Sequence, residues 1–92
     1  AEPNAGSIFK NPEGDYAGRL IEAAGCKKLG TKNASVNQLH ANFITHNGNA
    51  SSDEIVYLIT EIQKKVQSSF GIELTPEIEW WGPEVQPYCF NN

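Results

Sequence analysis

A hydroxyl, an ammonium and a carboxamide lie within five residues near the start of the chain, in the stretch Ser7-Ile8-Phe9-Lys10-Asn11. We expect a strand here, with Ser7 and Phe9 on one face and Ile8 and Lys10 on the other. Pro12 would end this strand, because proline has no N–H to donate and disfavours helix at the preceding residue. Binding and catalytic residues often lie at such strand ends. Ser7 is therefore the first candidate, and a surface edge strand is the alternative.

Two other combinations of catalytic residue types are less favoured. Ser7, His40 and Glu77 have the residue types of a hydrolytic triad, but the chain lacks the strand-turn-helix elbow that exposes such a serine. His40 and His46 would share one strand face, yet they are too far apart to be adjacent ligands, and zinc needs two further ligands. We therefore expect structural or surface histidines and no metal site. The sequence has no G-x-G-x-x-G or Walker loop, so no nucleotide-binding fold is expected.

A short helix is expected directly after the opening strand. Asp15 fits the N-cap of a helix over Tyr16–Ala24, and Gly25 fits its C-terminal stop. Gly18 inside this helix costs about 1 kcal/mol relative to alanine, which suggests that another backbone packs closely against it. The following loop is expected to contain a short strand near Ala34–Val36.

A long helix is the clearest periodic signal in the chain. Ser51 or Ser52 can cap it, and acidic residues in its first turn favour the helix dipole. Its apolar stripe follows i, i+3, i+4, i+7 spacing and consists of Ile55, Leu58, Ile59, Ile62, Val66 and Phe70. On the solvent side Glu61 is expected to pair with Lys65, and Gly71 is expected to end the helix.

Two extended segments complete the expected fold. Residues 40–46 favour a strand, and residues 72–81 favour an extended path interrupted by Pro76. Strands and helices mix without βαβ regularity, so the expected class is α+β, with a small mixed or antiparallel sheet covered by two helices. We expect a single domain over residues 1–82 and an extended tail over residues 83–92.

Composition restricts the partners of the chain. At 92 residues it is long enough for one small core. The net charge of −4 argues against nucleic acid or an anionic membrane as the main partner. Cys26 and Cys89 lack metal-ligand spacing, so two free thiols in a reducing cytosol are favoured over one disulfide. No apolar run has the length of a membrane span, and we expect a soluble domain.

Five segments carry a family likeness in a consistent order: Ala5–Pro12, Gly14–Glu22, His40–Ile44, Gly48–Ala50 and Leu74–Ile78. They resemble the C-terminal, substrate-binding domain of the bacterial UDP-N-acetylenolpyruvoylglucosamine reductases, or UDP-N-acetylmuramate dehydrogenases. The resemblance implies a cytoplasmic flavoprotein that uses FAD and NADPH in peptidoglycan synthesis, and hence in cell wall biogenesis, cell shape and cell division. Lys32-Asn33 stands where the family usually has a Gly-Gly-containing strand, so the local geometry there is open.

The resemblance also implies roles for individual residues. In the family, a hydride passes from NADPH through FAD to the enolpyruvyl ether, and the adjacent carbon is then protonated. Ser7 matches the serine that donates this proton, and Glu77 matches a glutamate that works with an arginine on the intermediate. Asn11 and Lys10 match positions near the diphosphate of the substrate, whose oxygens suit a cation and an amide donor. Three further matches are expected to be structural or peripheral: Arg19, His40 and Asn42.

The resemblance covers only part of an enzyme. The family's catalytic arginine and FAD-binding portion have no counterpart in this chain, so we expect it to bind no cofactor and to be inactive alone. It would bind UDP-N-acetylglucosamine enolpyruvate, supply the proton donor for its conversion to UDP-N-acetylmuramate, and need the missing FAD-binding domain. One alternative is a non-catalytic, stand-alone module for a UDP-sugar or a protein. Another is a dimerisation element that uses an apolar patch of Trp80, Trp81, Tyr88 and Phe90.

Overall fold

Helices and short strands follow one another irregularly, which is the α+β class that the sequence predicts. This computed structural model describes residues 4–77, 79–80 and 88–89, with side chains described over 7–77. In chain order the elements are β1 (Asn4–Ser7), α1 (Ala17–Ala23), the 3-10 helix η1 (Cys26–Lys28), β2 (Ala34–Val36), β3 (Phe43–His46), α2 (Ser52–Phe70), β4 (Glu79–Trp80) and β5 (Tyr88–Cys89). The expected domain boundary at residue 82 and most of the expected tail fall outside the described residues, and the side chains of the expected apolar patch fall outside the described side chains.

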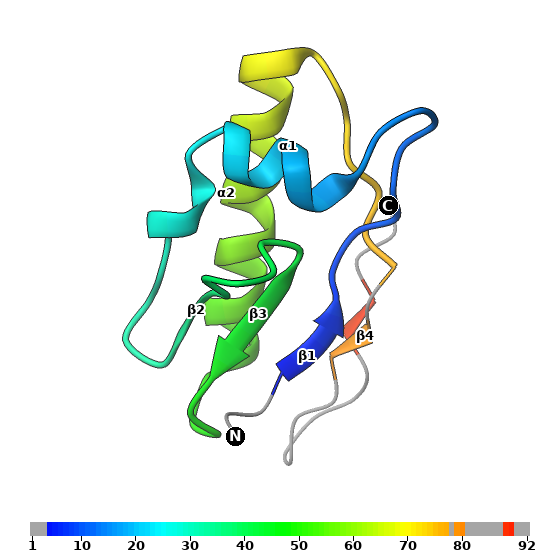
Figure 1. The fold of residues 1–92 in the computed structure, drawn as a ribbon. Coiled ribbons are helices and arrows are strands. Elements are labelled where there is room, and N and C mark those ends of the chain that lie inside the picture. Colours follow the sequence, from blue (N-terminus) through cyan, green and yellow to red (C-terminus); the bar gives the residue numbers. More distant parts are fainter. Residues whose placement is uncertain (1–3, 78, 81–87, 90–92) are drawn as a thin grey trace.

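The central sheet has three antiparallel strands in the order β1-β3-β2 (Figure 1). Its middle strand, β3, places Phe43 opposite Ser7 on one side and Ile44 opposite Val36 on the other. The predicted strand at Ala34–Val36 is thereby confirmed as β2. Strands β4 and β5 form a separate antiparallel pair. The order of the main sheet brings the end of β1 next to the turn that precedes β3.

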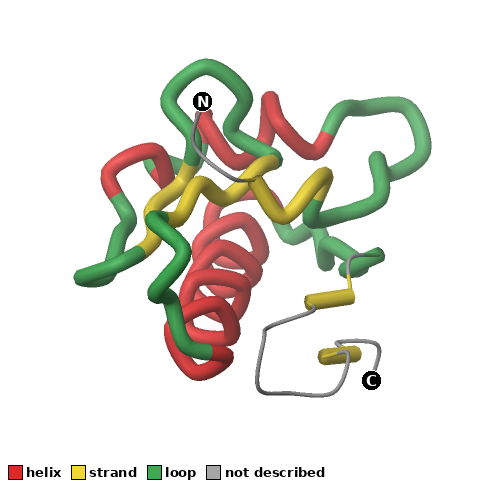
Figure 2. The backbone as a smooth tube through the Cα atoms, turned by 90° about the horizontal axis from the view of Figure 1, so that it is seen from below, coloured by secondary structure: helices red, strands yellow, loops and turns green. Residues whose placement is uncertain are grey.

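Helix α2 lies along one face of this sheet, and α1 crosses α2 beyond the end of the strands (Figures 1 and 2). Five residues of the predicted stripe are buried: Ile55, Leu58, Ile59, Ile62 and Val66. Burying each such side chain contributes roughly 1.5–3 kcal/mol. The sixth, Phe70, is 40% exposed because it ends the helix beyond the core. Glu61 pairs with Lys64 at 3.5 Å, not with Lys65 as expected. Within the described residues, no helix combines the length and apolar character that crossing a membrane requires.

Helix α1 begins at Ala17, one residue later than predicted, because Tyr16 keeps an extended backbone. It ends at Ala23, one residue before the predicted end, and Gly25 follows as the predicted stop in the left-handed conformation at φ 80°. The backbone of Gly18 does lie against Asn42, as the glycine suggested. A Cβ at Gly18 would nevertheless stand 3.8 Å from the nitrogen of Asn42, an ordinary contact distance, so the packing does not demand glycine.

The predicted strand over residues 40–46 begins only at Phe43. The residues before Phe43 form a turn in which its N–H donates to the carbonyl of His40 at 3.0 Å. The carboxamide oxygen of Asn37 accepts the N–H of His40 at 2.8 Å. Because a side chain satisfies this main-chain donor, the chain turns here and does not extend the strand.

The carboxylate of Glu54 joins the start of α2 to the loop before β2. Ser51 and Glu54 form a capping box, in which each side chain accepts the other residue's N–H at 3.2 Å. The same carboxylate accepts the hydroxyl of Thr31, and it accepts the N–H and Nδ2 of Asn33 at 3.0 Å each. The Thr31 and Asn33 hydrogen bonds, followed by that of Ser51, lower the pKa of Glu54 to about 2. The stretch that departs from the family pattern is therefore fixed by a carboxylate.

Glu54→Gln should flatten the acid limb of the stability profile. The folded-state pKa of Glu54 is lowered from 4.5 to about 2, so its contribution is present above about pH 4.5 and is lost as the pH falls through about 2. We expect the free energy of unfolding to fall over this window, and to fall less in Glu54→Gln. Asp15, whose pKa is also lowered to about 2, maintains part of the dependence. Denaturant titrations at a series of pH values measure it. Asp53→Asn, a change of equal charge in the same helical turn, is the control, and an equal flattening there would contradict the assignment.

Candidate functional site

The main chain after Ser7 is hydrogen-bonded along both of its edges. On one edge, the N–H of Ile8 donates to the carbonyl of Asn42 at 2.9 Å. On the other edge, the carbonyl of Ile8 accepts the N–H of Glu77 at 2.9 Å. The opening stretch and the segment that carries Glu77 are far apart in the sequence. In the fold they are neighbours.

The chain that leaves α2 returns antiparallel to the opening stretch. Phe9 and Pro76 form a β-bridge, and the N–H of Lys10 donates to the carbonyl of Thr75 at 2.9 Å. Phe9 and Pro76 face each other as a pair that exchanges no hydrogen bonds, so the missing N–H of proline leaves no bond unmade. Pro76 thus interrupts the predicted extended path without removing its pairing.

Ile8 and Phe9 are 0% and 1% exposed, respectively, so both are in the core, and β1 ends at Ser7, earlier than the strand predicted up to Pro12. Strand β1 ends its pairing with β3 at Ser7, and Phe9 pairs with Pro76 instead. The main chain thus changes its pairing partner between these positions, and both side chains are buried. Their burial fixes the main chain between the polar residues Ser7 and Lys10.

Ser7 is half-buried, and its hydroxyl oxygen accepts a hydrogen bond from Nδ2 of Asn42 at 3.0 Å. The same carboxamide also bonds the main chain of Phe9, with its oxygen on the N–H at 3.0 Å and its nitrogen on the carbonyl at 2.9 Å. The sequence suggested a structural or peripheral Asn42. The family match marked the position, but nothing local in the sequence indicated its contact with Ser7.

The side chains of Lys10 and Glu77 are exposed. Their main chains lie in the paired segments, so the fold fixes where each side chain starts. The structure therefore brings Glu77 beside the stretch that begins at Ser7 and leaves its carboxylate open to solvent. Lys10 lies at the rim of the same region.

The sequence assigned the N-cap of α1 to Asp15, but Tyr16 occupies that position without a side-chain cap, and Asn11 accepts the first helical N–H instead. The carboxamide oxygen of Asn11 accepts the N–H of Ala17 at 2.9 Å. Asp15 accepts the N–H of Tyr16 at 2.7 Å and pairs with Arg19 at 2.6 Å. The hydrogen bond from Arg19 lowers the pKa of Asp15 to about 2. Arg19 thus has a partner at the surface. The other atom of the Asn11 carboxamide, Nδ2, makes no hydrogen bond within the described residues.

Among the side chains that the structure describes, the other reactive groups do not assemble into a second site. The ring of His40 packs edge-on against Phe43, with centroids 5.9 Å apart, and the hydroxyl of Ser7 bonds Asn42. No cluster of three or more His, Cys, Asp or Glu side chains in the described part of the chain could bind a metal ion. Cys26 is a free, buried thiol, and burial raises its pKa. The side chain of Cys89 lies outside the described ones.

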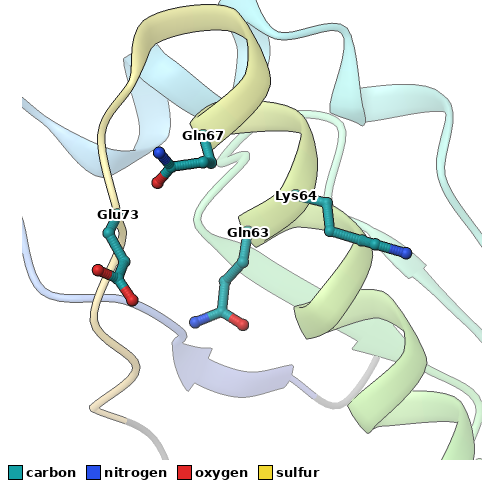
Figure 3. A pocket seen from close by; sticks show the side chains of 4 residues that line it. All are labelled: Gln63, Lys64, Gln67 and Glu73. Atoms are coloured by element: carbon teal, nitrogen blue, oxygen red, sulfur yellow. The ribbon is translucent and has the colours of Figure 1, made fainter.

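A separate open hollow of about 290 Å³ lies between α2 and the chain that follows it (Figure 3). Its lining consists of Gln63, Lys64, Gln67 and Glu73. Nε2 of Gln63 donates to the carbonyl of Leu74 at 3.1 Å, so this side chain also ties α2 to the returning segment. The hollow contains none of the predicted site residues.

Comparison with known proteins identifies relatives of this chain. Residues 1–81 match the family model described as the C-terminal domain of UDP-N-acetylenolpyruvoylglucosamine reductase. Over 80 residues the chain is 48% identical to UDP-N-acetylenolpyruvoylglucosamine reductase 2 of Symbiobacterium thermophilum. Over 80 residues it is 50% identical to the corresponding reductase of Moorella thermoacetica. Each match covers 87% of this chain and 26% of the relative, so the chain spans about a quarter of their length.

A solved structure shares the fold. The crystal structure of UDP-N-acetylenolpyruvylglucosamine reductase from Thermus caldophilus matches with a TM-score of 0.62 and 38% identity. The match covers 77% of this chain and 25% of that protein.

The cap formed by Asn11 can be tested by two substitutions. Asn11→Ala removes the acceptor for the N–H of Ala17, and we expect it to lower the free energy of unfolding by about 1 kcal/mol. Asn11→Asp keeps an oxygen at that position, so its stability should stay within about 0.5 kcal/mol of the parent. Denaturant unfolding measures both. Equal losses in the two variants would show that the oxygen of Asn11 does not stabilise α1.

Proposed function

Because the chain belongs to the family of UDP-N-acetylenolpyruvoylglucosamine reductase C-terminal domains, we propose that it is the substrate-binding domain of such an enzyme. It would bind UDP-N-acetylglucosamine enolpyruvate for conversion to UDP-N-acetylmuramate, a cytoplasmic step of peptidoglycan synthesis. The observation that carries the proposal is the hydrogen bond of 2.9 Å from the N–H of Glu77 to the carbonyl of Ile8. It joins the two segments that match the family's proton donor and its glutamate.

A reductase also needs a hydride source, and this segment does not fit that task. Its sequence contains neither of the glycine-rich phosphate-binding patterns. We therefore assign no residue of this chain to FAD or NADPH, which the remainder of a full-length enzyme would bind. When bound there, FAD would supply the hydride that the methylene carbon of the enolpyruvyl group receives. This chain alone would be inactive, and the FAD-binding portion is its proposed partner.

Ser7 would complete the reduction by donating a proton. The added hydride forms a C–H bond at the methylene carbon, and the electron pair of the former double bond moves to the adjacent carbon and its carboxylate. The O–H bond of Ser7 then breaks, its proton forms the second C–H bond, and the serine oxygen regains a proton from solvent. A hydroxyl is a weak acid, so the step depends on a strongly basic acceptor held at close range.

The neighbouring polar side chains have complementary tasks in this proposal. Glu77, when protonated, would donate a hydrogen bond to the oxygen on which negative charge develops. Lys10 and the free Nδ2 of Asn11 would bind the oxygens of the diphosphate, where a cation and an amide donor are favourable. The use of the Asn11 oxygen in capping α1 supports this, because it would orient the nitrogen away from the helix.

Ser7→Ala in a full-length reductase that contains this segment should separate the two half-reactions. We expect flavin reduction by NADPH to proceed at the parent rate and product formation to slow by about 100- to 10,000-fold, the usual contribution of a positioned acid. Anaerobic stopped-flow absorbance follows both steps. Ser35→Ala, at an exposed serine of β2, is the control. Unchanged product formation in Ser7→Ala would remove the proposed role and favour a non-catalytic sugar-binding module.

Glu77→Gln should slow product formation by about 100-fold in the same enzyme, since the amide cannot replace a carboxylic acid that stabilises developing charge. Glu79→Gln is the matched control, because Glu79 is the nearest other carboxylate in that segment. Single-turnover oxidation of the reduced flavin by substrate measures both variants. A larger loss in Glu79→Gln would move the role to that residue.

A further inference from the structure

We infer that Asn42 is a positioning residue that directs the proton of Ser7 toward the substrate. The inference rests on the proposed function of Ser7 as proton donor and adds a residue that acts through it. Its basis is the hydrogen bond of 3.0 Å from Nδ2 of Asn42 to the hydroxyl oxygen of Ser7.

The orientation of the Asn42 carboxamide is fixed by its contacts with the main chain. The N–H of Phe9 can only donate, so the atom 3.0 Å from it has to be the oxygen Oδ1. The carbonyl of Phe9 can only accept, so the atom 2.9 Å from it has to be the nitrogen Nδ2. A flipped amide would place its nitrogen against the N–H of Phe9, donor against donor, and its oxygen against the carbonyl of Phe9, acceptor against acceptor. The atom that faces Ser7 is therefore a donor.

This assignment determines where the serine proton points. Nδ2 carries two hydrogens, and one bonds the carbonyl of Phe9 while the other bonds the oxygen of Ser7. Toward Asn42 the serine is consequently an acceptor, and its own hydrogen has to lie in another direction. Once the proton has left, the same N–H faces the serine oxyanion and stabilises it. One contact thus orients the donor and supports the charge that remains.

Asn42 is itself held in place from two sides. Its main-chain carbonyl accepts the N–H of Ile8 at 2.9 Å, so backbone and side chain bond the same stretch. The helix α1 covers it, since a Cβ added at Gly18 would stand 3.9 Å from the Cβ of Asn42. A side chain with this support can fix a hydroxyl with little loss of entropy at the moment of reaction.

Asn42→Asp in a full-length reductase that contains this segment tests the inference. One carboxylate oxygen still accepts the N–H of Phe9, but the other has no hydrogen and would accept the proton of Ser7, turning it away from the substrate. We expect flavin reduction by NADPH to change by less than about 2-fold and product formation to slow by about 100-fold. The loss should appear in kcat more than in KM. The solvent deuterium isotope effect on flavin reoxidation should increase, because proton transfer becomes slower.

Asn37→Asp is the matched control. It makes the same substitution in the same turn, where the carboxamide oxygen of Asn37 accepts the N–H of His40 and the nitrogen bonds the hydroxyl of Thr45 at 2.7 Å. This variant should keep product formation near the parent rate. An equal loss in Asn37→Asp would show that the turn as a whole matters, and it would overturn the inference.

A double-mutant cycle with Ser7→Ala distinguishes the two levels of the argument. If Asn42 acts through Ser7, Asn42→Asp slows product formation in the parent and adds nothing in the Ser7→Ala background. Equal factors in both backgrounds would refute the role of Asn42 while leaving Ser7 as donor. No loss in Ser7→Ala itself would refute the proposed function first.

A second variant and a second measurement distinguish a loss of function from a folding defect. Asn42→Ala removes the carboxamide without adding charge, and it goes through the same cycle with melting temperatures recorded for each protein. In heteronuclear NMR spectra, the side-chain amide signal of Asn42 should shift in Ser7→Ala and stay in place in Ser35→Ala. An unmoved signal in Ser7→Ala would show that the two side chains are not bonded, and the inference would fail.

Discussion

The arrangement of the site depends on the double hydrogen bonding of one short stretch of main chain. Ile8 and Phe9 are buried, and buried backbone donors and acceptors have to find partners. Asn42 supplies them on one edge, and the segment that contains Glu77 supplies them on the other. Because both edges are occupied, residues from three distant parts of the chain are brought to one place. Ser7 lies at the start of this stretch.

Stability and the proposed chemistry depend on the same contacts. The carboxamide of Asn42 satisfies the buried backbone of Phe9 and also bonds the hydroxyl of Ser7. The carboxamide of Asn11 divides its atoms in a similar way, with the oxygen on α1 and the nitrogen available to a ligand. A substitution at either position would change folding and the proposed function together, so an isosteric variant is needed to separate the two effects.

The long helix α2 determines where the segment that carries Glu77 begins. Gly71 adopts the left-handed conformation at φ 68° and ends α2, so the chain can reverse and run back along the opening stretch. At the other end of the helix, Glu54 fixes the loop before β2 through Thr31 and Asn33. The position of Glu77 is thus set by a helix that is capped, buried along one stripe and terminated at defined residues.

The sequence by itself determined the elements whose signals are local. The cap at Ser51, the stop at Gly71 and the apolar stripe between them predicted α2 closely, because capping and periodicity act within a few residues. The strand at Ala34–Val36 and the α+β class were also predicted correctly. The family likeness selected Ser7 and Glu77 as candidates, and their catalytic roles remain proposals.

Only the tertiary structure decided how these residues meet. It gave the first N–H of α1 to Asn11 in place of the predicted cap at Asp15, and it ended β1 at Ser7 with both Ile8 and Phe9 buried. It also placed the carboxamide of Asn42 on Ser7. Each of these outcomes depends on a partner that lies outside the local sequence, and a hydrogen bond across such a separation leaves no periodic or capping signal in the chain.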